Sequence, residues 1–242
     1  MITISPGHWK VGSGAVGLID EVTEARKVVD RVVKLLEHRG IKVHKIVDNQ
    51  SKNQRENVQF LVNSHNKTDR QIDVSVHFNA IKGIETRAIG TEVLYQEEAV
   101  KPLATNLSKA IATAASFVNR GAKKRLDLAF LNNTKKQAVL LEICFVNSTV
   151  DVALYEKHFE AICHSIASTL AEYVRPAIQM FSSPALHNRV EAMFYNNTKV
   201  AHLLQKGVER GSFLPVWREK HAQGNLTLMD FCGLCVLLGE EE

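Results

Sequence analysis

Short apolar runs and longer amphipathic stretches alternate along the first 175 residues of this chain. The short runs are typical of buried strands, which they predict at residues 2–5, 42–47, 72–77, 91–95 and 137–143. The longer stretches repeat apolar side chains every three to four positions, and they predict helices at residues 21–39, 53–65, 101–118 and 152–173. Alternating strands and helices predict an α/β fold whose mostly parallel, twisted sheet has helices on both faces.

The pattern changes after residue 175. Two prolines, Pro176 and Pro184, bracket a short segment and predict a linker at residues 176–183. Residues 184–242 show short helical patterns without strand alternation. We therefore predict a first domain at residues 1–175 and a small all-α module at residues 184–242, whose exposed apolar faces favour self-association. An internal start at Met180 would release free copies of this module, which could assemble with the full-length chain.

Composition and charge narrow the class of protein. Apolar residues make up 45% and charged residues 23% of the 242, as in ordinary globular proteins. No apolar run approaches the roughly 18–20 residues that span a bilayer, so we expect no membrane insertion. The chain does not open on a basic segment followed by an apolar core, so we expect synthesis in the cytoplasm without a secretory signal. The net charge of +4 is too weak to favour nucleic acid, but it suits an anionic polymer.

Four residues stand where predicted elements begin or end: His8, Glu21, His77 and Glu142. In parallel sheets, ligands bind beyond the carboxyl ends of strands, where His8, His77 and Glu142 fall. Two imidazoles and a carboxylate suit Zn²⁺, and a second carboxylate can act as a base, so this set predicts a hydrolase. Spacing alone is a weak signal, since His77 taken singly also fits a core or surface histidine. Glu142 ends an apolar run, where a carboxylate is costly to bury without a cation.

Six segments, in this order, resemble the zinc-dependent N-acetylmuramoyl-L-alanine amidases of the type-3 class, which occur in bacterial autolysins and phage endolysins. The resemblance covers residues 1 to about 175. The matching segments are Ser5–His8, Gly14–Gly17 leading into Asp20 and Glu21, Ser75–Ala80, Gly90–Tyr95, Asn119–Ala122 and Ala138–Asn147. Where family members often have a glycine-rich stretch after the first histidine, this chain has Trp9, Lys10 and Val11, a change expected at the rim of the site.

The resemblance implies one Zn²⁺ held by His8, Glu21 and His77, with Glu142 as the catalytic carboxylate. It implies cleavage of the amide between N-acetylmuramic acid and L-alanine in peptidoglycan, with anionic wall polymer as a further partner. An endolysin would reach the cell wall after release, assisted by a holin if it is phage-encoded, and residues 184–242 would bind the wall or oligomerise. A host-encoded autolysin or spore-related amidase, or a wall-binding protein without turnover, are the alternatives.

Two residue assignments stay open, one for a metal ligand and one for a substrate contact. Glu24 lies one helical turn from Glu21 and could replace it as a ligand, although the family spacing favours Glu21. Asn79 is a candidate substrate contact, but it could also brace His77 or form a strand-end turn.

Several other polar residues are expected at ordinary surface positions. Four histidines are expected on strand or helix surfaces without a special role: His44, His65, His158 and His164. The basic run Lys123, Lys124 and Arg125 could line an anionic groove, although a solvated loop fits it better.

Overall fold

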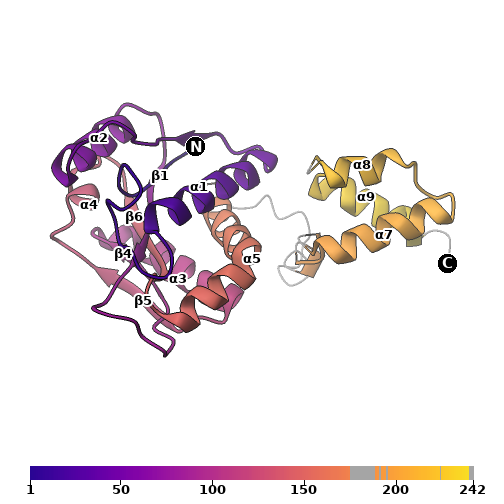
Figure 1. The fold of residues 1–242 in the computed structure, drawn as a ribbon. Coiled ribbons are helices and arrows are strands. Elements are labelled where there is room, and N and C mark those ends of the chain that lie inside the picture. The colour runs from indigo at the N-terminus through magenta and orange to yellow at the C-terminus, as the bar shows by residue number, and fades with distance from the viewer. Residues whose placement is uncertain (175–188, 191, 195, 224, 240–242) are drawn as a thin grey trace. The chain divides into compact units, whose positions relative to one another are not determined.

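The computed structural model describes residues 1–174, 189–190, 192–194, 196–223 and 225–239. It divides the chain into two compact units, Met1–Pro176 and Ala177–Glu242. The first unit contains all the described strands, and the described elements of the second unit are helices (Figure 1). Met180 and the predicted linker at residues 176–183 lie outside the described residues.

The first unit is built on a six-stranded sheet with the order β2-β1-β3-β6-β4-β5. The strands are β1 (Ile2–Pro6), β2 (Val43–Lys45), β3 (Ile72–Asn79), β4 (Thr91–Tyr95), β5 (Asn119–Lys124) and β6 (Ala138–Phe145). Neighbouring strands are parallel except for β4 and β6, which are antiparallel. The predicted α/β fold with a mostly parallel sheet is therefore confirmed.

Helices cover both faces of this sheet. On one face, the main apolar core is formed by α1 (Glu21–His38), α3 (Lys101–Ala115), which follows the short 3₁₀ helix η1 (Glu98–Val100), and α5 (Thr149–Val174). On the other face, α2 (Gln54–Asn66) and α4 (Ala129–Asn133) form a smaller cluster with Leu94 of β4 and Leu140 of β6. Figure 1 shows α2 and α4 on the side of the sheet opposite α1 and α5.

Side-chain alternation divides β3 between these two faces. Val74, Val76 and Phe78 belong to the main core, so Ser75 and His77 point to the face of α2 and α4. The same alternation on β6 and β4 assigns Glu142 and Glu92 to that second face. Polar side chains therefore follow the second face toward the carboxyl ends of β3 and β6.

The clearest correction to the predicted elements is β5, a strand where a solvated loop was expected. Its sequence, Asn119–Lys124, has no apolar alternation, because it is an edge strand that pairs with β4 alone. Exposed basic side chains are common on edge strands, where they discourage further pairing. The helix expected to reach residue 118 ends at Ala115, since Ser116 adopts a left-handed φ of 59°.

The prediction that His65 lies on a helix surface is wrong. Its side chain is fully buried between α2 and the sheet, where Nδ1 is 2.8 Å from Asp73 Oδ1 and Nε2 is 3.0 Å from Ser5 Oγ. Arg70 donates two hydrogen bonds to the same Asp73 carboxylate, at 2.8 and 2.7 Å. Burial lowers the pKa of His65, although Asp73 opposes the shift.

The described part of the second unit contains α7 (Asn197–Glu209), α8 (Val216–Ala222) and α9 (Leu228–Gly239). Thr227 caps the last helix, because its Oγ accepts from the amide of Asp230 at 3.1 Å and the Asp230 carboxylate accepts from the amide of Thr227. The helices enclose a core of their own, formed by Val200, Leu204, Phe213, Leu226, Phe231 and Leu234.

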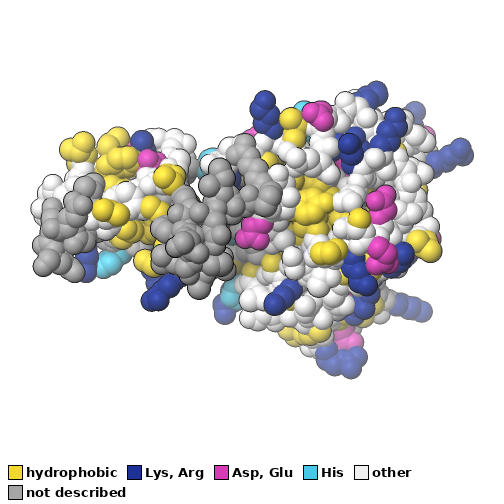
Figure 2. Space-filling view, turned by 180° about the vertical axis from the view of Figure 1, so that it is seen from behind, with side chains coloured by type: hydrophobic (Ala, Val, Ile, Leu, Met, Phe, Trp, Pro, Cys, Tyr) yellow, Lys and Arg dark blue, Asp and Glu magenta, His cyan; other side chains and the backbone are white. Residues whose placement is uncertain are grey.

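Among the described residues, no helix has the length and apolar character needed to cross a membrane. On the face shown in Figure 2, Lys and Arg side chains are scattered over the first unit with Asp and Glu among them, rather than gathered in one patch.

Candidate metal centre and active site

His8 follows β1 in an unusual backbone conformation. Its φ of +64° lies in the left-handed region, which residues other than glycine seldom adopt and which costs energy. This turn brings His8 Nε2 to 3.1 Å from Glu21 Oε2. Its other ring nitrogen, Nδ1, is buried and has no hydrogen-bond partner in the described part of the chain. Strained residues at strand ends are frequent in functional sites.

Glu21 opens α1 and is buried between the two imidazoles. Its Oε1 lies 2.9 Å from His77 Nδ1 and accepts a hydrogen bond from the amide of Phe78, while Oε2 accepts one from the amide of Ala15 at 2.6 Å. Burial opposes ionisation, but the hydrogen bonds and positive charges of His77 and His8 outweigh it and hold the pKa of Glu21 well below its usual range. Glu21 therefore presents a carboxylate anion.

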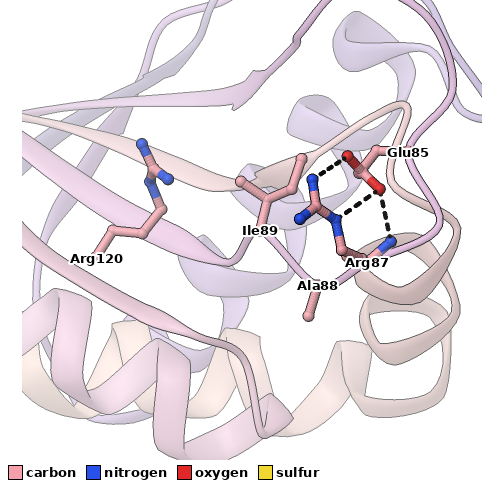
Figure 3. Close-up of a pocket in the computed structure, with 5 residues that line it drawn as sticks. All are labelled: Glu85, Arg87, Ala88, Ile89 and Arg120. Carbon is pink, nitrogen blue, oxygen red and sulfur yellow. Dashed lines mark hydrogen bonds and ion pairs between the residues drawn. The ribbon is translucent and has the colours of Figure 1, made fainter.

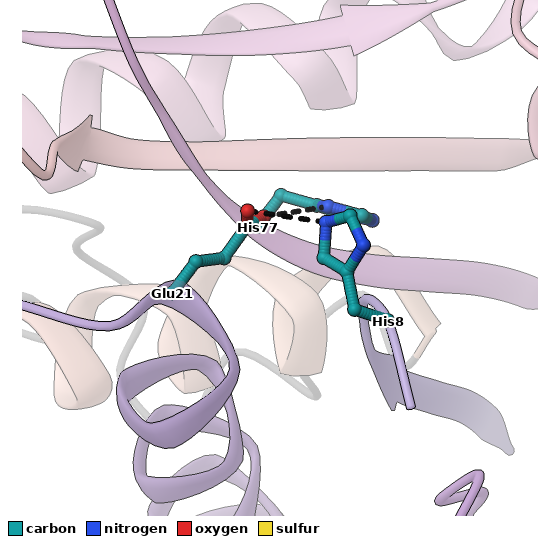
Figure 4. Close-up of side chains that lie close together, drawn as sticks. All are labelled: His8, Glu21 and His77. Atoms are coloured by element: carbon teal, nitrogen blue, oxygen red, sulfur yellow. Dashed lines mark hydrogen bonds and ion pairs between the residues drawn. The ribbon is translucent and has the colours of Figure 1, made fainter. Parts of the chain in front are cut away.

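His77 completes the cluster from β3. Its ring meets that of His8 edge to face, with the centroids 5.1 Å apart, and its Nε2 lies 3.0 Å from Ser75 Oγ. One ligand atom from each of His8, Glu21 and His77 lies within 4.8 Å of the other two. Figure 4 shows the three side chains converging from the segment after β1, the start of α1 and the end of β3.

The surroundings of these three side chains fit a metal ion. Two imidazoles and one carboxylate form a donor set that Zn²⁺ accepts. Gly7 and Gly14 allow the backbone to approach closely: a Cβ at Gly7 would overlap the His77 ring, and one at Gly14 would lie 2.5 Å from Glu21 Oε2. Only glycine fits at these two positions without displacing a candidate ligand.

Glu24, the alternative ligand, points elsewhere. Its Oε2 accepts a hydrogen bond from the hydroxyl of Tyr155 on α5 at 2.9 Å, and its Oε1 pairs with Lys27 at 2.8 Å. The geometry thus favours Glu21 over Glu24 as the carboxylate that could hold a metal.

Glu142 lies beside the cluster on β6. It is the register partner of His77, and partners on neighbouring strands point to the same face of a sheet. Burial raises the pKa of Glu142 well above its usual value, the charges of Glu21 and Glu92 add to this, and Arg125 opposes it. Among the described residues, nothing hydrogen-bonds to its buried Oε2. Glu142 is therefore suited to take up a proton.

Glu92 and Arg120 extend this site, and the sequence did not single them out as functional. Glu92 on β4 is the antiparallel register partner of Glu142. Its Oε1 accepts a hydrogen bond from the side-chain amide of Asn79 at 3.2 Å, and its Oε2 accepts one from Arg120 Nε at 2.8 Å. The sequence offered two signals: Glu92 is a carboxylate inside the apolar run of residues 91–95, and both Glu92 and Arg120 lie in segments that resemble the family. Asn79 also accepts from the amide of Ala80, in a strand-end turn, so a substrate contact stays a prediction.

The family of the chain follows from comparison with known proteins. The Amidase_3 family model, described as N-acetylmuramoyl-L-alanine amidase, matches residues 2–172. The chain belongs to this family. The resemblance inferred from the six segments is therefore confirmed.

Curated relatives of this amidase-family chain occur in Clostridium perfringens. An uncharacterised 38.4 kDa protein is 32% identical over 180 residues, which cover 73% of this chain and 52% of the relative. An uncharacterised protein of Clostridium perfringens (strain 13 / Type A) is 31% identical over 180 residues, 71% of this chain and 51% of the relative. The chain thus spans about half the length of the curated relatives it matches.

Solved structures of catalytic domains share the fold of the first unit. The catalytic domain of an endolysin targeting Clostridia Difficile is 27% identical with a TM-score of 0.62, over 72% of this chain and 95% of that one. The catalytic domain of an N-acetylmuramoyl-L-alanine amidase from Bacillus (Paenibacillus) polymyxa var. colistinus is 25% identical with a TM-score of 0.60, over 72% and 97%. The matched share of this chain corresponds in size to its first unit.

Proposed function

We propose that this chain is a zinc-dependent amidase that cleaves the bond between N-acetylmuramic acid and L-alanine in peptidoglycan. His8, Glu21 and His77 hold the zinc, and Glu142 is the catalytic carboxylate. The observation that carries the proposal is the convergence of two imidazoles and a buried carboxylate next to Glu142, whose Oε2 has no partner in the described structure. Membership of the amidase family supports the same reaction.

The chemistry follows from the positions of these side chains. Bound zinc supplies a Lewis acid that makes water more acidic and polarises the scissile carbonyl. Glu142 accepts the proton of the attacking water at Oε2 and then delivers it to the nitrogen of the leaving L-alanine. Burial raises its pKa, which brings a carboxylate closer to the range where it can both accept and release a proton. Glu21 would supply the anionic ligand beside the two imidazoles.

The test is a Glu142→Gln variant of the full chain, loaded with zinc and incubated with purified peptidoglycan. We expect wild-type zinc content and a loss of new L-alanine amino termini of at least about 100-fold, because a general acid and base is removed while the ligands stay. Glu24→Gln is the matched control, since it changes a carboxylate in the same unit that faces Tyr155 instead of the site. Release of L-alanine termini by Glu142→Gln at the wild-type rate would refute the role of Glu142.

We further propose that the chain acts as an endolysin, with a catalytic domain at residues 1–175 and a helical module at 184–242 that binds anionic wall polymer or oligomerises. The likeness to an endolysin catalytic domain and the separate core of the second unit support this division. Expression together with a holin should lyse the host, whereas expression alone should not. Lysis without a holin would favour an exported autolysin with the same chemistry.

A further inference from the structure

A pocket of about 270 Å³ lies next to the proposed active site and plays no part in the reaction described above. It is lined by Glu85, Arg87, Ala88, Ile89 and Arg120. In Figure 3 the Ile89 side chain lies between the two arginine side chains, with Glu85 on the far side of Arg87. The pocket therefore combines two cations and one carboxylate with two apolar side chains.

Arg120 connects this pocket to Glu142. A bulge in β5 places Arg120 and Gly121 opposite the single residue Glu92, and Gly121 allows the bulge with a φ of +78°. Arg120 uses only Nε to bind Glu92, which is the register partner of Glu142. Its guanidinium lies 5.2 Å from the centroid of the Phe145 ring. Within the described structure, the two Nη atoms of Arg120 have no hydrogen-bond partner, so they are available to a ligand.

Arg87 forms the opposite wall on a loop that is tied to the start of α5. The Asp151 carboxylate accepts hydrogen bonds from the amides of Ile89 and Gly90, at 3.0 and 2.9 Å, and Ser148 Oγ donates to the carbonyl of Arg87 at 2.8 Å. Three backbone groups of this loop are thus held in place. The loop can position Arg87 without help from a ligand.

The Arg87 side chain itself is free to exchange partners. It is paired with Glu85 at 3.0 Å, but 84% of the Arg87 side chain is exposed. Exposed ion pairs contribute little stability, and Arg87 Nη1 has no partner among the described residues. A carboxylate that enters the pocket can therefore bind both Nη atoms of Arg120, in the forked geometry that arginine favours, together with Nη1 of Arg87.

The position of the pocket indicates which part of the substrate reaches it. From Glu142 on β6 to Arg120 on β5 the sheet spans two strand spacings, about 10 Å at roughly 4.8 Å each. An extended peptide advances about 3.3 Å per residue, so this distance corresponds to two or three residues. We propose that the pocket binds a carboxylate on the second or third residue of the stem peptide and so selects acidic stem peptides. This inference rests on the proposed function.

The experiment uses the full chain loaded with zinc and three synthetic N-acetylmuramoyl tripeptide amides. They carry a free carboxylate at the second residue, at the third residue, or at neither. We expect kcat/KM for at least one acidic peptide to exceed that for the neutral peptide about 10-fold. A factor of this size is what a hydrogen-bonded pair of opposite charges contributes. Arg87→Gln should lower that value toward the value for the neutral peptide. Arg31→Gln is the matched control, because it also breaks an arginine–glutamate pair, on α1 and α5.

Binding of the same peptides to Glu142→Gln, measured by calorimetry, separates the two proposals. If Glu142→Gln binds an acidic peptide about 10-fold more tightly than the neutral one, and adding Arg87→Gln removes this preference, the pocket is supported. This outcome supports the pocket even if the wild type cleaves none of the peptides and the proposed function fails. Equal binding and equal cleavage of all three peptides overturns the pocket while the amidase function stands. An equal loss on all three peptides in Arg87→Gln indicates a structural role for Arg87 and also overturns it. Absence of both binding and cleavage refutes both proposals.

Discussion

At the residue scale, the two carboxylates of the first turn of α1 differ in surroundings although they lie only one turn apart. Glu21 is buried against both imidazoles, whereas Glu24 binds Tyr155 and Lys27. A carboxylate that lies between two imidazoles can share a metal ion with them, whereas one that is bound to a hydroxyl and a lysine has its lone pairs engaged elsewhere. This difference yields a direct test of the ligand assignment.

We predict that Glu21→Gln lowers the affinity for zinc at least about 10-fold, because the amide removes the anionic ligand and leaves two imidazoles. Glu24→Gln should keep wild-type affinity. Competition with a chromophoric chelator measures both variants at one pH. A loss of affinity in Glu24→Gln together with wild-type affinity in Glu21→Gln would reverse the assignment.

The sequence allowed the four principal site residues to be proposed, since they stand where predicted elements begin or end and the resemblance to the amidase family implies their roles. The cost of burial argued for Glu142 alone. The sequence could not identify the Glu92–Arg120 pair. That pair exists only because β4 runs antiparallel to β6 and β5 carries a bulge opposite Glu92. Both features depend on strand pairing between distant segments, which local patterns do not encode.

At the element scale, the surface position predicted for His65 was wrong for the same reason: local patterns do not show which segments pack together. Helix α2 shows a weak apolar face, so its histidine was assigned to the surface. Its partner Asp73 lies in the strand that follows and supplies the hydrogen bond that makes burial possible. Arg70 completes the network from the loop between them. Helices with a strong apolar pattern, such as α1, were predicted correctly, because an apolar side chain can be buried without a polar partner.

The buried pair of Arg70 and Asp73 should be important for stability. Arg70→Met leaves the Asp73 carboxylate buried without its cation, and we expect the free energy of unfolding to fall by about 3–5 kcal/mol. Arg31→Met breaks the partly exposed pair with Glu160 and should cost about 0–1 kcal/mol. Urea unfolding followed by circular dichroism compares the two. Equal small losses would show that the Asp73 charge is compensated in another way.

His164 on α5 should make stability depend on pH. Burial, together with the charges of Arg31 and Arg39, lowers its pKa to about 4, although Glu160 opposes the shift. In the unfolded chain His164 has a pKa of about 6.5, so between pH 6.5 and 4 the unfolded state binds more protons. Stability from this residue is therefore complete above pH 6.5 and is lost as the pH falls toward 4.

We expect this contribution to be about 1–3 kcal/mol, after allowance for the 17% exposure of the side chain. His164→Gln, which carries no charge at any pH, should flatten the decline of stability between pH 6.5 and 4. The free energy of unfolding, measured by urea titration at several pH values, gives the slope for each protein. Parallel slopes for the wild type and His164→Gln would contradict the prediction.

At the scale of the whole molecule, the chain consists of two units with separate apolar cores. The change of pattern near residue 175 indicated such a division, because a sheet-based core and a helical core need different periodicities. What the second unit binds could not be predicted, since its sequence contains helical faces but no group of residues with a recognisable chemistry. The roles assigned to residues 176–183 and 184–242, including the start at Met180, stay predictions.

The separation of cores predicts that the second unit can be unfolded without loss of the first. Leu204 is 1% exposed at the centre of its core, and Leu204→Ala should cost about 2–5 kcal/mol, a large part of the stability of so small a unit. Zinc affinity and kcat/KM on a soluble muramoyl peptide should stay at wild-type values, while sedimentation with cell walls declines. Lys206→Ala, at an exposed position of the same helix, is the control. Unchanged wall sedimentation in a variant whose second unit has lost amide-exchange protection would place wall binding in the first unit.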